Sequence, residues 1–75
     1  MTEVAVYSVQ PLALSGTDVS VQKLPAGFLY HYRYVGLRLL YMSSGTYYLL
    51  PAGWSPQLPL TFVLETNDET SVEFY

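Results

Sequence analysis

The chain has 75 residues, 51% of them hydrophobic and 16% aromatic, so we expect one small folded domain over residues 1–75 and exclude a disordered segment. It has no cysteine, which excludes disulfides and thiolate metal sites. Six acidic and three basic residues give a formal net charge of −3, a balance that makes nucleic acid and an anionic membrane surface unlikely partners.

Turn residues divide the chain into short runs rich in Val, Tyr, Leu, Thr and Phe, which is typical of β-strands. The first two predicted strands cover residues 3–10 and 18–24. They are separated by Pro11 and by a Ser-Gly-Thr turn at residues 15–17. In the second strand Val19 and Val21 alternate with polar residues, so we expect one of its faces to meet water.

The third predicted strand, residues 28–42, is the longest. Tyrosine recurs at every second position until Gly36 interrupts the alternation. A β-bulge at Gly36 would shift the phase by one residue and place six side chains on one face: Tyr30, Tyr32, Tyr34, Leu37, Leu39 and Tyr41. A helix is the alternative because Leu and Arg are good helix formers, but the tyrosines and Gly36 favour a strand.

Three further strands are predicted over residues 46–50, 58–65 and 70–75. The first of these is apolar on both faces, so we expect it to be central. The next places Phe62 and Leu64 on its apolar face together with Leu58 and Leu60. We expect the polar turn at residues 66–69 to pair this strand with the last one, in which Val72 and Phe74 face the core.

Residues 39–64 carry no charge, a stretch long enough to suggest a membrane span. Proline, glycine and serine divide it into runs of four or five apolar residues, whereas a spanning helix needs about 20 in a row. The N-terminal segment contains Glu3 instead of a basic region, so no signal peptide is predicted. With no cysteine either, we expect a cytoplasmic location.

The titratable residues do not form a recognisable catalytic or metal-binding motif. His31 is the only histidine, and a metal site would need carboxylates from distant strands. Ser43, Ser44 and Asp18 have no recognisable nucleophile motif around them. The acids near residues 65–69 are expected to be solvated in a turn. We therefore predict no enzyme, no catalytic residue, no metal and no cofactor.

The most distinctive feature is the tyrosine row formed by Tyr30, Tyr32 and Tyr34. Such a row is either a set of core rings whose hydroxyls reach the rim or an exposed binding surface. The second interpretation gives a candidate interaction site that includes neighbouring polar residues and the tryptophan of the loop at residues 51–57. Its members are Tyr30, Tyr32, Tyr34, Arg33, His31 and Trp54.

Together these patterns predict an all-β fold: a five- or six-stranded antiparallel barrel or sandwich in the size class of SH3-like and OB-like domains. The predicted function is a non-catalytic protein–protein interaction module, such as an accessory subunit, regulator or small inhibitor. Its partner would be another protein or a second copy, bound through the tyrosine strand. The alternative is an aromatic platform for single-stranded nucleic acid or a small ligand.

The charges are unevenly distributed along the chain. All three basic residues lie between Lys23 and Arg38, and residues 65–75 contain four acids and no base. Pairing of these two regions within one molecule is the simpler interpretation, and head-to-tail association of copies is the alternative.

Overall fold

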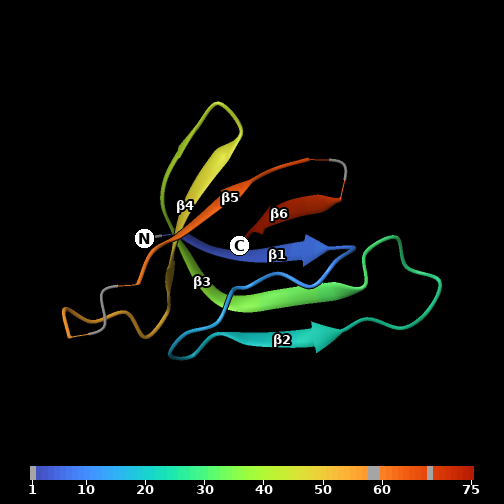
Figure 1. Ribbon diagram of the computed structural model, residues 1–75, viewed down its shortest axis with the longest axis horizontal. Coiled ribbons are helices and arrows are strands. Elements are labelled where there is room, and N and C mark those ends of the chain that lie inside the picture. Colours follow the sequence, from blue (N-terminus) through green and yellow to red (C-terminus); the bar gives the residue numbers. More distant parts are fainter. Residues whose placement is uncertain (1, 58–59, 68) are drawn as a thin grey trace.

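A computed structural model describes residues 2–57, 60–67 and 69–75, and within these ranges the chain forms six β-strands and no helix (Figure 1). The all-β prediction is therefore confirmed, and the third run is a strand. The strands are β1 (Thr2–Ser8), β2 (Ser20–Lys23), β3 (Tyr32–Ser43), β4 (Thr46–Pro51), β5 (Phe62–Glu65) and β6 (Thr70–Phe74). No helix that could cross a membrane occurs in these ranges.

The six strands form one antiparallel sheet in the order β5-β4-β3-β1-β6, with β2 paired to β3 beside this path. β3 is the organising strand because it pairs with three others. Its first half lies between β1 and β2, and its second half lies beside β4. The predicted central position of the fourth strand is confirmed, since β4 lies between β3 and β5.

The predicted bulge at Gly36 is present. Val4 of β1 pairs with Leu37 and Val6 pairs with Tyr34, so β3 has one residue more than β1 across this step. Gly36 has φ 81°, and a Cβ at this position would overlap the carbonyl oxygen of Asp18. Only glycine meets both conditions without strain. The bulge keeps Tyr34 and Leu37 on the same buried side of the sheet.

A second bulge changes the predicted face of Tyr41. Leu39 pairs with Leu49, and Tyr41 pairs with Tyr48, so Leu40 is an extra residue on β3. Leu49 belongs to the core, whereas the next residue along β4, Tyr48, points to the opposite side. The prediction that Tyr41 shares a face with Leu39 is therefore wrong, because the bulge at Leu40 reverses the alternation.

The predicted pairing of the last two strands is also wrong. β5 pairs with β4 and β6 pairs with β1, and no Cα atom of β5 lies within 8 Å of one of β6. The sheet bends along β3 and is not closed into a barrel (Figure 1). Part of the predicted fifth strand, Leu58 and Pro59, lies outside the described residues, and the observed strand begins at Phe62.

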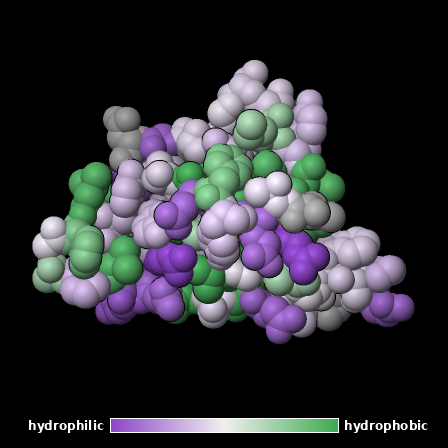
Figure 2. Space-filling model, turned by 180° about the vertical axis from the view of Figure 1, so that it is seen from behind, coloured by the Kyte–Doolittle hydropathy of each residue, from purple (hydrophilic) through white to green (hydrophobic). Residues whose placement is uncertain are grey.

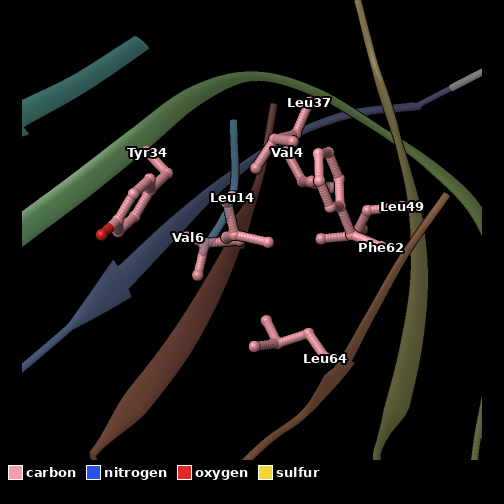
Figure 3. Close-up of a cluster of buried hydrophobic side chains, with 8 residues drawn as sticks. All are labelled: Val4, Val6, Leu14, Tyr34, Leu37, Leu49, Phe62 and Leu64. Carbon is pink, nitrogen blue, oxygen red and sulfur yellow. The ribbon is translucent and has the colours of Figure 1, made fainter. Parts of the chain in front are cut away.

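The core lies on the concave side of this bent sheet (Figure 3). Seven of the eight buried side chains in its central cluster come from strands. The eighth, Leu14, comes from the irregular segment between β1 and β2 and points into the cluster in Figure 3. Tyr34 lies at the border of the cluster with its hydroxyl pointing outward. The cluster consists of Val4, Val6, Leu14, Tyr34, Leu37, Leu49, Phe62 and Leu64.

β5 provides a direct test of this packing, because buried and exposed side chains alternate along it. Phe62→Ala and Leu64→Ala are each expected to lower the free energy of unfolding by about 2–5 kcal/mol, since each leaves a cavity in a small core. Val63→Ala, on the exposed side of the same strand, is the matched control and should change it by less than about 0.5 kcal/mol. Denaturant titration measures all three, and equal effects at the three positions would contradict the assigned face.

Candidate interaction surface

The tyrosine row is divided between two sides of the sheet. Tyr34 is 4% exposed and belongs to the core. Its hydroxyl accepts a hydrogen bond from the Leu12 amide at 2.7 Å and donates one to the Leu12 carbonyl at 3.2 Å. The hydroxyl of Tyr34 therefore has hydrogen-bond partners, as the core interpretation of the row requires. The same bonds hold the β1–β2 segment over the core.

The other two tyrosines of the row differ from each other. Tyr32 is half-buried and packs against the core cluster. Tyr30 precedes β3, and its ring lies 6.0 Å from that of Tyr7, measured between centroids. Tyr7 points away from the core because its neighbours Val6 and Ser8 are the buried residues of that part of β1. The three tyrosines therefore do not form one continuous surface.

Arg33 is at the centre of a polar network on the outer side of the sheet. Its Nε donates to the Tyr7 hydroxyl at 3.0 Å, one terminal nitrogen donates to Gln22 at 3.3 Å, and the other lies 3.9 Å from Glu73. The Tyr7 hydroxyl in turn donates to Glu73 at 3.1 Å. The hydrogen bond to Tyr7 is the largest cause that raises the pKa of Arg33, so the guanidinium stays charged.

This network also explains part of the uneven charge distribution. Arg33–Glu73 is the only ion pair among the residues that the structure describes, and it joins the basic and the acidic regions of one molecule. At 3.9 Å and with both side chains partly exposed, it contributes little to stability. Its main effect is to fix the outer side of β1, β3 and β6 through hydrogen bonds.

The remaining residues of the predicted site lie apart from this network. His31 is exposed in the segment before β3, where its backbone amide donates to Ser8 at 2.9 Å. Trp54 is 41% exposed and lies in a turn after β4, closed by a 3.0 Å bond from its amide to the Pro51 carbonyl. In the described part of the chain, no three acidic or histidine side chains are close enough to hold a metal ion.

A row of apolar side chains that sequence reasoning did not select crosses three strands on the outer side. Tyr41 of β3 pairs with Tyr48 of β4, which pairs with Val63 of β5. The two tyrosine rings are 6.0 Å apart, and Tyr41 and Val63 are 60% and 61% exposed. We call Tyr41, Tyr48 and Val63 the outer row. The signal for it was the uncharged stretch at residues 39–64, which contains all three residues.

Apolar groups do not cover one whole side of the molecule. In Figure 2 they form separate patches divided by hydrophilic side chains. One patch lies at the end of the molecule formed by the β2–β3 connection, where Phe28 and Leu29 are exposed. The outer row differs from this loop patch because its three side chains are held on paired strands, in direct register.

Comparison with known proteins gives no guide to the function of these surfaces. No family model, no curated protein and no solved structure matches the chain. The candidate function must therefore be argued from the surface itself.

The role of Tyr34 can be tested by removing its hydroxyl alone. Tyr34→Phe keeps the ring in the core but leaves the Leu12 amide without its partner, so we expect a loss of about 1–3 kcal/mol in the free energy of unfolding. Tyr32→Phe is the control, because that hydroxyl makes no hydrogen bond within the described part of the chain, and it should have little effect. Chemical denaturation of both variants measures the difference. Equal stability of the two variants would show that the Leu12 contact contributes nothing.

Proposed function

We propose that the chain is a non-catalytic protein–protein interaction module whose contact surface is the outer row. The observation that carries this proposal is the register of Tyr41, Tyr48 and Val63 across three strands, which holds two exposed side chains and a half-buried ring side by side. Tyrosine is enriched at protein interfaces and in their hot spots. Side chains held on paired strands also lose less conformational entropy on binding than side chains on a mobile loop.

This proposal moves the interaction surface along β3. The initial candidates Tyr32 and Tyr34 pack against or within the core, so their rings already have partners. Tyr41, on the same strand, is exposed because the bulge at Leu40 turns it outward. The strand that was expected to bind is retained, but its contact residues lie beyond the second bulge.

A second copy of the chain is the partner that the charge pattern favours. In a two-fold symmetric dimer a surface packs against itself, so a charge close to the two-fold axis would meet its own copy. The outer row itself contains no charge, and the charged residues on the same side of β3 and β5, Arg38 and Glu65, lie on opposite sides of the row. The acids of the β5–β6 connection and of β6 would repel each other if those regions met instead.

Sedimentation equilibrium over a range of concentrations tests this proposal. We expect wild type to dimerise, and Tyr41→Lys and Val63→Lys each to weaken the dimer at least about tenfold by placing like charges at its centre. The matched control is Phe28→Lys, which makes the same charge change at an apolar residue that is 60% exposed but lies in the β2–β3 loop.

Two results would contradict the dimer. Wild type could stay monomeric at about 1 mM, where any association stronger than about 4 kcal/mol is populated. Alternatively, Phe28→Lys could weaken the dimer as much as Val63→Lys does. Binding of a labelled single-stranded oligonucleotide that weakens steeply with salt would instead favour an aromatic platform, with Arg38 as the phosphate contact beside the tyrosines.

A further inference from the structure

The two ends of the sheet cannot pair with each other. All pairings are antiparallel, so strand direction alternates along the order β5-β4-β3-β1-β6, and the two end strands have the same sense relative to the sheet. Direct pairing of β5 with β6 would therefore be parallel. Parallel neighbours need a connection of about a dozen residues or more, and only residues 66–69 join these two strands. The sheet stays open for a topological reason.

Among the residues that the structure describes, no strand pairs with the backbone groups on the two sides of this opening. The Thr66 amide donates to Gly45 at 3.0 Å, and bonded pairs recur at every second residue of an antiparallel ladder. The amides and carbonyls of Phe62 and Leu64 therefore point toward β4, and those of Val63 and Glu65 point into the opening. The side chains of Val63 and Glu65 lie on the outer side of the sheet.

The same reasoning applies to β6. Bonds from the Val9 amide to Glu69 at 2.9 Å and from the Tyr75 amide to Glu3 at 3.1 Å bracket its ladder with β1. Three residues between them, Thr70, Val72 and Phe74, therefore point away from β1. The Thr70 amide donates to Asn67 at 3.2 Å, which leaves Val72 and Phe74 with both their amides and their carbonyls directed into the opening. The side chains of Val72 and Phe74 lie on the core side, where Val72 packs against the cluster. The ring centroids of Phe74 and Tyr47 are 6.2 Å apart.

One added strand satisfies both edges. In an antiparallel pair, residues that bond each other have their side chains on the same side of the sheet. In a strand antiparallel to both β5 and β6, the residues with side chains on the outer side would therefore bond β5. The residues with side chains on the core side would bond β6. No Cα atom of β5 lies within 8 Å of one of β6, which exceeds the single strand spacing of about 4.8 Å, so the two edges are not paired with each other. Completing the ring this way makes every pairing antiparallel.

The side chains around the opening define the chemistry of that strand. On the core side it would face Phe62, Leu64, Val72 and Phe74, so its inward residues must be apolar. On the outer side the described residues of β5 and of the β5–β6 connection carry Glu65 and Glu69 and no basic residue, whereas Glu73 of β6 is already bound by Tyr7 and Arg33. Its outward residues must therefore be basic or neutral.

We infer that the opening between β5 and β6 is a binding site for an extended segment of a partner protein in which apolar and basic residues alternate. Main-chain hydrogen bonds would give affinity, and the alternating side chains would give specificity. This inference does not need the outer row to bind anything, so it stands or falls separately from the proposed dimer.

A synthetic peptide of alternating Val and Lys residues is a direct probe, and fluorescence anisotropy measures its binding. We expect it to bind wild type. The equally long peptide of alternating Val and Glu should bind at least about tenfold more weakly, because the outer side of the opening is acidic. N-methylation of its Lys residues removes the donors to β5, and N-methylation of its Val residues removes the donors to β6. Each modification alone should weaken binding at least about tenfold.

Protein variants test the same site from the other side. Val63→Pro removes an amide that points into the opening, and edge strands tolerate such a proline, so the fold should survive and binding should be lost. Val21→Pro is the matched control: the Leu24 amide bonds His31, so by the same alternation the Val21 amide points away from β3 at the free edge of β2. Neither Val21→Pro nor Tyr41→Ser, in the outer row, should change binding.

Several outcomes would overturn the inference. Binding lost in Val21→Pro but retained in Val63→Pro would place the peptide on β2. Sensitivity to only one of the two N-methylations would show addition to a single edge instead of insertion between two. Equal binding of the Lys and Glu peptides would remove the charge argument. If Val63→Pro fails to fold by circular dichroism, the two N-methylated peptides decide the question with wild-type protein.

Discussion

β3 carries the hydrogen bonds of three other strands, and the whole arrangement depends on how its backbone changes direction at Gly36. At this bulge β3 has one residue more than β1, and Gly36 accommodates it with a positive φ. The extra residue keeps Tyr34 and Leu37 on the core side. It also divides one edge of β3 into two parts, so that β2 pairs before the bulge and β4 pairs after it. A Cβ at Gly36 would overlap the carbonyl oxygen of Asp18, so a glycine here also leaves room for the backbone that leads into β2.

The opening between β5 and β6 follows from this organisation. Because β2 pairs beside the main path, five strands alternate in direction along it, and an odd number of strands cannot close with antiparallel pairs alone. The segment between β1 and β2 partly compensates, since Leu14 enters the core and Leu12 is held by Tyr34. The outer side is divided as well: hydrogen bonds of Arg33 fix the part over β1 and β6, and the outer row occupies the part over the second half of β3, β4 and β5.

The sequence predicted local structure well and long-range pairing poorly. The runs between turns became strands, and the bulge at Gly36 could be predicted because this residue interrupts the alternation of the third strand. Its positive φ is a conformation that glycine adopts readily. The bulge at Leu40 has no such marker, because leucine gives no local signal, so the face of Tyr41 was assigned wrongly. The pairing of β5 with β6 was expected from a short polar turn, but the partners of a strand depend on the whole sheet. Tyr30 was separated from Tyr32 and Tyr34 because β3 begins only after it.

The central claim is that the sheet ends in two unpaired edges facing one opening, and amide hydrogen exchange measured by NMR tests it most directly. Amides that bond a neighbouring strand are protected, and those that face solvent exchange quickly. The structure predicts slow exchange for Leu64 and Glu73, which point toward β4 and β1, and fast exchange for Val63 and Val72, which point into the opening. Strong protection of Val63 and Val72 in the isolated protein would show that the two edges are already paired and would contradict the account.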